Sequence, residues 1–141
     1  MNHEVFVKMN EICKSFGTVR ANHKVNFEVN KGEIHALLGE NGAGKSTLMN
    51  MLSGFYKPDS GSVYIHNKEV KLNSPKDAIK QGIGMIHQHY KLVEVLTAKE
   101  NIIMGQKGKF FLNKSEISKE IKAVADKYGL PVDPDKKLYD M

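Results

Sequence analysis

The sequence has one cysteine and no long apolar run, and each shortage excludes a class of protein. A lone cysteine, Cys13, cannot form an internal disulfide or a cysteine-based metal cluster, which is typical of proteins in the reducing cytoplasm. No stretch approaches the roughly 18 to 20 consecutive apolar residues that span a bilayer, and the N-terminus lacks the apolar core of a signal peptide. We therefore expect any association with a membrane to come through a partner.

The composition is that of an ordinary globular protein with a modest basic excess. Its 141 residues are 40% hydrophobic and 26% charged, which suffices for one core. The formal net charge of +5 would suit an anionic ligand, a membrane surface or nucleic acid. The positive residues are scattered, however, and the short clusters Lys107–Lys109 and Lys136–Lys137 have no interleaved aromatic residues. We expect a solvated surface and no dedicated nucleic-acid binding.

The first part of the chain predicts strands that lead into a glycine-rich turn. Apolar residues alternate at positions 5–9 and again at 25–29, which indicates two strands with one buried face each. Glu33–Leu38 is almost continuously apolar, which predicts a strand covered on both faces. Lys45–Ser53 is rich in helix formers and is followed by Gly54, a suitable helix C-cap. The expected order is therefore strand, loop, helix.

The middle of the chain is marked by turn and cap residues. A turn at 57–61 precedes a predicted hairpin with arms 62–66 and 69–72. A helix begins with Ser74 as its N-cap and ends near Gly82, and Ile83–Gln88 is the next predicted strand.

Two more helices are expected in the last third. Thr97 and Glu100 have the spacing of a capping box, which opens a short helix ending near Gly105. From Asn113 or Ser115 to Gly129, apolar residues recur at helical spacing and form a stripe that needs a covering partner. The stripe consists of Ile117, Ile121, Val124, Ala125 and Tyr128.

The strongest motif lies between the predicted buried strand and the helix that follows it. GENGAGKS fits the pattern G-x-x-x-x-G-K-[ST] of a P-loop, and a strand before it with a helix after it is the context that such a loop requires. Glycines allow successive backbone N–H groups to point at phosphate oxygens, and the helix N-terminus adds positive potential. The predicted nucleotide-binding residues of this loop are Gly39, Glu40, Asn41, Gly42, Ala43, Gly44, Lys45, Ser46 and Thr47.

Three side chains at the end of the loop have separate roles in this prediction. Lys45 reaches the β- and γ-phosphates and neutralises charge that would oppose attack by water, so we assign it a catalytic role. The hydroxyl of Ser46 is placed to ligate Mg²⁺, and Thr47 adds a hydrogen bond to the α-phosphate. The predicted cofactors are therefore ATP and Mg²⁺.

Beyond the generic P-loop, residues 39–61 (GENGAGKSTLMNMLSGFYKPDSG) closely resemble the nucleotide-binding domain of ABC transporters, and nearly the whole chain can be aligned with that family. Residues 83–105 resemble the family's Q-loop region, which implies that Gln88 contributes to catalysis and ligates Mg²⁺. Phe16 matches the aromatic residue that stacks on adenine in the family, although core packing is the alternative. His87 and His89 flank Gln88 and could face one way on an extended chain, but no third metal ligand accompanies them.

The resemblance implies an α/β fold with an ABC-type P-loop NTPase core and an antiparallel β subdomain at residues 1–110. Residues 111–141 would begin a helical subdomain. Residues 74–102 look most like importers of nucleosides and simple sugars. The implied partners are transmembrane permease subunits, an extracytoplasmic solute-binding protein and a second ATP-binding domain in a head-to-tail dimer. The implied location is the cytoplasmic face of the membrane.

The chain departs from the family in one respect, because it has no signature segment, no apolar strand ending in Asp-Glu and no switch histidine. We interpret the chain as the N-terminal part of a longer polypeptide, with weak ATP binding and negligible hydrolysis by itself. Two alternatives remain at this point. One is a soluble ABC-type ATPase that acts on nucleic acid, and the other is a non-catalytic module that docks a membrane subunit through residues 89–105.

Overall fold

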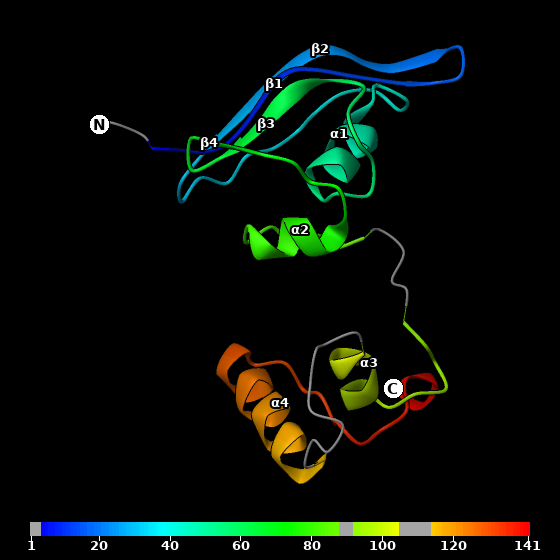
Figure 1. Ribbon diagram of the computed structural model, residues 1–141. Coiled ribbons are helices and arrows are strands. Elements are labelled where there is room, and N and C mark those ends of the chain that lie inside the picture. The colour runs from blue at the N-terminus through cyan, green and yellow to red at the C-terminus, as the bar shows by residue number, and fades with distance from the viewer. Residues whose placement is uncertain (1–3, 88–91, 105–113) are drawn as a thin grey trace. The chain divides into compact units, whose positions relative to one another are not determined.

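The computed structural model describes residues 4–87, 92–104 and 114–141, and the chain divides into two compact units, Met1–Met85 and Ile86–Met141 (Figure 1). The domain boundary predicted between residues 110 and 111 lies outside the described residues, so it stays a prediction.

The first unit contains a four-stranded antiparallel sheet. Its strands are β1 (Val5–Phe16), β2 (Val19–Asn30), β3 (Ser60–Ile65) and β4 (Lys68–Val70), arranged in the order β2-β1-β3-β4. The apolar alternation at 5–9 and 25–29 is confirmed as the pair β1 and β2, and the hairpin predicted after the turn at 57–61 is confirmed as β3 and β4. Both residues of the β3–β4 turn have positive φ, the conformation that matches the twist of a two-residue hairpin.

Helices α1 (Lys45–Leu52) and α2 (Pro75–Lys80) complete this unit and were both predicted. Gly54 has a φ of 76° just after α1, and Ser74 caps α2 by accepting from the N–H of Asp77. The core forms where apolar side chains of β1, β3, α1 and α2 meet. Its buried members are Val7, Met9, Ile12, Leu48, Met51, Val63, Ile65, Leu72 and Ala78.

Two predicted strands are wrong. Neither Glu33–Leu38 nor the described part of Ile83–Gln88, residues 83–87, is a strand in this structure (Figure 1). Ile34 is 100% exposed, Leu38 88% and Ile86 87%. A continuously apolar strand is stable only between neighbouring strands that bond to it and layers that cover it. Among the described residues, the single sheet provides no such neighbour for either segment.

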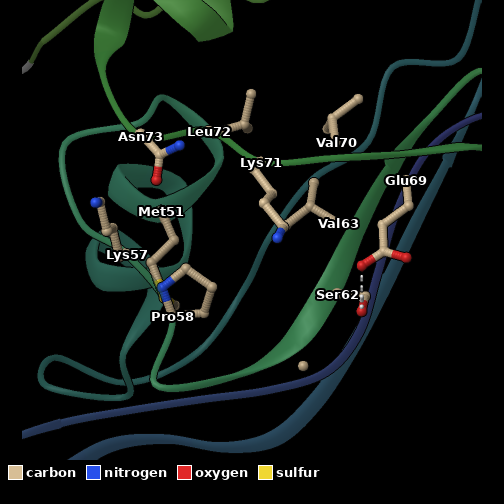
Figure 2. A pocket seen from close by; sticks show the side chains of 11 residues that line it. Met51, Lys57, Pro58, Ser62, Val63, Glu69, Val70, Lys71, Leu72 and Asn73 are labelled. Atoms are coloured by element: carbon tan, nitrogen blue, oxygen red, sulfur yellow. Dashed lines mark hydrogen bonds between the residues drawn. The ribbon is translucent and has the colours of Figure 1, made fainter.

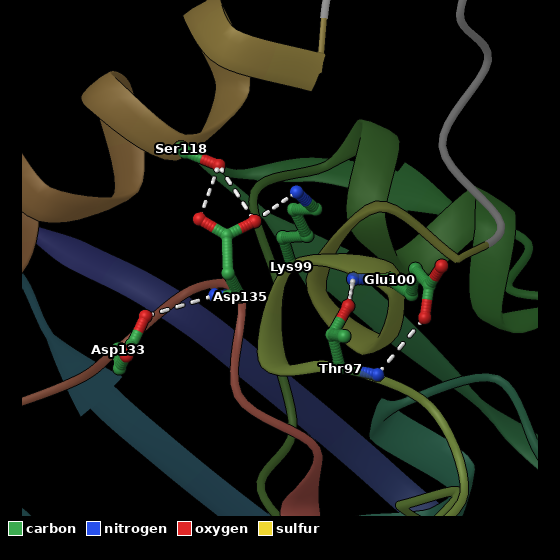
Figure 3. Close-up of polar contacts among 6 residues, drawn as sticks. All are labelled: Thr97, Lys99, Glu100, Ser118, Asp133 and Asp135. Atoms are coloured by element: carbon green, nitrogen blue, oxygen red, sulfur yellow. Dashed lines mark hydrogen bonds and ion pairs between the residues drawn. The ribbon is translucent and has the colours of Figure 1, made fainter.

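The second unit contains α3 (Ala98–Ile103), α4 (Lys114–Tyr128) and the short 3-10 helix η1 (Leu138–Asp140). The predicted capping box of α3 is confirmed, because Thr97 accepts from the N–H of Glu100 while Glu100 accepts from the N–H of Thr97 (Figure 3). The predicted start of α4 is confirmed to within a residue. The stripe of α4 is only partly covered, since Ile117 and Ala125 are buried whereas Val124 is 58% and Tyr128 65% exposed.

Asp135 joins the elements of the second unit. Its carboxylate pairs with Lys99 of α3 and accepts from the hydroxyl of Ser118 of α4 at 3.4 Å, while its own N–H donates to Asp133 at 3.0 Å (Figure 3). The hydrogen bond from Lys99 is the main cause that lowers the pKa of Asp135 below its ordinary value. These contacts link α3, α4 and the loop before η1.

We predict that this link weakens in acid. Because folding lowers the pKa of Asp135, its contribution is fully present above the ordinary aspartate pKa of about 3.9 and is lost as the pH falls toward the lowered value. Urea unfolding followed by NMR at α3 and α4 should therefore show a smaller loss of stability below about pH 4 in Asp135→Asn than in the unmodified chain. Asp126→Asn, a change of the same chemistry on an exposed site of α4, is the control. The same pH dependence in both variants would contradict this role of Asp135.

A second prediction concerns the contact between β1 and the start of β3. A Cβ at Gly61 would lie 2.5 Å from the carbonyl oxygen of Glu11 and 2.6 Å from that of Asn10, and the φ of Gly61 is 95°. Gly82 has a φ of 81° but nothing within 4 Å of an added Cβ. Gly82→Ala should cost only the left-handed strain of about 1 kcal/mol, and Gly61→Ala should cost about 1 to 3 kcal/mol more in denaturant unfolding. If the two variants lost the same free energy of unfolding, β1 and β3 would be able to move apart at Gly61 without cost, and the prediction would be wrong.

Candidate functional site

The glycine-rich segment Gly39–Thr47 lies in the first unit, follows the mostly exposed segment 33–38 and includes the first three residues of α1. Gly42 and Gly44 have φ values of 85° and 82°, which a residue with a side chain adopts only under strain. A Cβ at Gly44 would also lie 2.2 Å from the carbonyl oxygen of Ala21 in β2. Glycine is required at position 44 for both reasons, and β2 supports the loop directly.

Lys45 bends back over this loop. Its Nζ donates to the carbonyl oxygen of Gly39 at 2.6 Å and to that of Glu40 at 2.7 Å. A Cβ at Gly39 would lie 3.5 Å from Cβ of Ala43 and 3.7 Å from Cδ of Lys45, so Ala43 and the stem of Lys45 pack close to Gly39. The structure thus brings the predicted residues Gly39 and Glu40 together around the Lys45 ammonium group, and Ala43 lies close to Gly39.

The N-terminus of α1 adds to the positive character of the loop. Gly44 is the N-cap, no side chain caps the first turn, and that turn contains no acidic residue. Backbone N–H groups at such an end favour an anion. Ser46 is exposed and Thr47 is half-buried in this first turn, while Asn41 and Gly42 are exposed in the loop. The ammonium and the uncapped turn fit a phosphate group, and the hydroxyl of the exposed Ser46 fits the oxygen-ligand preference of Mg²⁺.

Phe16, the predicted adenine-stacking residue, lies at the end of β1 and is 44% exposed. Its ring packs edge to face against Tyr56, with centroids 5.2 Å apart, and the Nζ of Lys14 lies 5.5 Å from its centroid. Asp59 accepts from Lys14 and from the N–H of Ser15, both at 2.7 Å. The hydrogen bond from Lys14 is the main cause that lowers the pKa of Asp59.

The sequence analysis did not identify two residues that contact the end of β1 around Phe16. Tyr56 precedes the predicted turn at 57–61 and Asp59 lies in it, and their contacts with β1 join residues at least 40 positions apart. Their one local signal is an aromatic residue before a charged turn. Phe16 packs against Tyr56 but stays 44% exposed, so part of its ring is accessible for stacking.

A third missed residue is Asn22 of β2. It is 6% exposed, and its Nδ2 donates to the carbonyl oxygen of Gly44 at 3.3 Å. A polar residue at a buried position of a strand is the only sequence signal that could have identified it.

The predicted catalytic and metal-ligating Gln88 lies outside the described residues, as does His89. Its role therefore stays a prediction. No group of three or more His, Cys, Asp or Glu side chains within the described ranges could hold a metal ion, so the histidine-pair hypothesis gains no third ligand there.

A separate pocket of about 200 Å³ lies at the other end of α1, between that helix, β3 and β4 (Figure 2). Its floor is apolar, with Met51, Val63 and Leu72, and its rim carries Lys57 and Lys71. None of the predicted site residues lines this pocket. We assign it no part in the site around Lys45.

Comparison with known proteins places this geometry in a family. Residues 22–141 match the family described as ABC transporter. The chain is 46% identical over 98% of its length to the guanosine import ATP-binding protein NupO of Bacillus subtilis (strain 168), and 43% identical over 94% to the galactose/methyl galactoside import ATP-binding protein MglA of Yersinia pestis. It spans 28% and 26% of the lengths of these two relatives.

A solved structure supports the same assignment. A nucleotide-free ATP-binding cassette from an ABC transporter superposes with a TM-score of 0.79 at 28% identity, over 97% of this chain and 59% of that one. This similarity confirms the predicted α/β class, with a P-loop NTPase core of the ABC type. Within the ranges that the structure describes, no helix has the length and apolar character needed to cross a bilayer. The chain belongs to the ABC transporter family.

Proposed function

We propose that these 141 residues hold ATP and Mg²⁺ for an ABC importer. The observation that carries the proposal is the Lys45 ammonium, held over a glycine-rich loop at the uncapped start of α1. Residues Gly39–Thr47 hold the phosphates through backbone N–H groups, Ser46 and Gln88 ligate Mg²⁺, and Phe16 stacks on adenine. When bound, Mg²⁺ supplies positive charge that offsets the charge of the phosphates.

In the whole protein, we propose that ATP hydrolysis drives the import of nucleosides or simple sugars. The names of the two relatives, one a guanosine and one a galactose import protein, support this solute class. Transport also requires transmembrane permease subunits, an extracytoplasmic solute-binding protein and a second ATP-binding domain. The protein then lies at the cytoplasmic face of the membrane, attached through the permease.

The structure does not favour the alternative of an ATPase that acts on nucleic acid. Several lysines form ion pairs with acidic neighbours. Lys8 pairs with Glu28 at 2.6 Å, Lys14 pairs with Asp59 at 2.7 Å, and Lys99 pairs with Asp135. Paired lysines contribute little to binding a phosphate backbone.

We predict that the unmodified chain binds Mg²⁺-ATP saturably in a calorimetric titration and that Lys45→Ala weakens this binding at least about tenfold, because a charged hydrogen-bond donor is lost. Lys68→Ala, which removes an exposed lysine of β4, is the matched control and should leave the affinity unchanged. If the unmodified chain does not bind, or if Lys45→Ala binds normally, the proposed phosphate site is wrong.

Phe16 can be tested separately from the loop. Inorganic tripolyphosphate carries the phosphates of ATP without a base, so Phe16→Ala should weaken ATP binding about 5- to 100-fold while the affinity for tripolyphosphate stays the same. Phe16→Tyr, which keeps the aromatic ring, should retain ATP binding. A parallel loss for ATP and tripolyphosphate would mean that Phe16 supports the fold and does not contact adenine.

A further inference from the structure

The side chain of Asn22 connects β2 to the first peptide of α1. It lies at a buried position of the strand, and its Nδ2 donates to the carbonyl oxygen of Gly44 at 3.3 Å. The orientation of the amide follows from this contact, since a carbonyl oxygen can only accept. A Cβ at Gly44 would lie 2.8 Å from the same Nδ2, so the two groups touch only because position 44 is glycine.

The carbonyl of Gly44 accepts two hydrogen bonds. One comes from Asn22, and the other comes from the N–H of Leu48 at 2.9 Å, which closes the first turn of α1. The peptide that follows this carbonyl carries the N–H of Lys45. Because a peptide is planar, fixing the oxygen at one end fixes the direction of the N–H at the other. Asn22, which lies outside the loop, therefore helps to fix the direction of the Lys45 N–H.

The other end of the Asn22 amide is not satisfied. Within the described residues, its buried Oδ1 has no hydrogen-bond partner. A buried acceptor without a donor destabilises a fold, and an apolar residue of similar volume avoids that cost. Asn22 therefore stabilises the fold less than an apolar residue would at the same buried position. This indicates that its role is to hold the loop.

We propose that Asn22 is a positioning residue, which holds the Gly44 peptide so that the loop N–H groups converge on the phosphate position. The positioning itself is a property of the free chain. Its effect on nucleotide affinity rests on the proposed function above.

The test compares Asn22→Leu with the unmodified full chain. Leucine has the same branched shape with methyl groups in place of the amide nitrogen and oxygen, removes the hydrogen bond to Gly44 and also removes the unsatisfied Oδ1. We expect the amide of Leu48 to exchange with solvent about fivefold faster by NMR, which corresponds to the loss of one ordinary hydrogen bond. The melting temperature should stay the same or rise, and the affinity for tripolyphosphate should fall.

Asn26→Leu is the matched control. Asn26 is an exposed residue of the same strand, and it bonds to Glu11 and not to the loop. This change should leave both the exchange of Leu48 and the affinity for tripolyphosphate unaltered. Asn22→Asp, which places a carboxylate oxygen against the Gly44 carbonyl, should speed the exchange of Leu48 more than Asn22→Leu does.

Two results would overturn the proposal. One is unchanged exchange of Leu48 in Asn22→Leu, and the other is a lower melting temperature with faster exchange throughout the core strands, which would make Asn22 an ordinary structural residue. Failure of the unmodified chain to bind tripolyphosphate would count against the proposed function. The exchange of Leu48 would still decide whether Asn22 holds the loop.

Discussion

The approach of Gly44 to the carbonyl of Ala21 is the constraint on which the site depends. An added Cβ would lie 2.2 Å from that oxygen, so the loop can rest on β2 only with glycine at this position. This contact fixes where α1 begins, and α1 in turn contributes Leu48 and Met51 to the core shared with β1 and β3. The same close packing thus joins the stability of the first unit to the geometry of its phosphate-binding loop.

The two units depend on different kinds of interaction, apolar packing in the first and polar contacts in the second. In the first unit, a buried apolar cluster between the sheet and its helices carries most of the packing. In the second unit, fewer of the described side chains are buried, the polar contacts of Asp135 connect its elements, and the capping box of Thr97 fixes the start of α3. Exposed ion pairs stabilise weakly, so we expect the second unit to be the less stable of the two.

Local signals in the sequence predicted most of the helices and hairpins correctly. The Ser74 cap and the Thr97 capping box each involve neighbouring residues, and both are confirmed. The turn predicted at 57–61 is wrong in its second half, because Ser60 and Gly61 already belong to β3. The apolar run Glu33–Leu38 was misread because its strand conformation depends on neighbouring strands, which the described residues do not supply. Local pattern gives no information about such distant partners.

The residues of the candidate site also divide into those with a local sequence signal and those without one. The P-loop pattern located Lys45 and its glycines, because the residues that shape the loop are consecutive. Asn22 and Tyr56 were missed because their contacts, with Gly44 and Phe16, join segments far apart in the chain. The roles of Gln88 and Phe16 came from family resemblance alone.

The central claim is that the loop at 39–47 is already shaped for phosphate in this chain. The most direct measurement is an NMR titration of the unmodified chain with Mg²⁺-ATP, following each backbone amide. We predict that the largest saturable shifts fall on the amides of Gly42, Gly44, Lys45 and Ser46, with smaller shifts near Phe16. Saturable shifts confined to other parts of the chain, or no shifts at all, would contradict it.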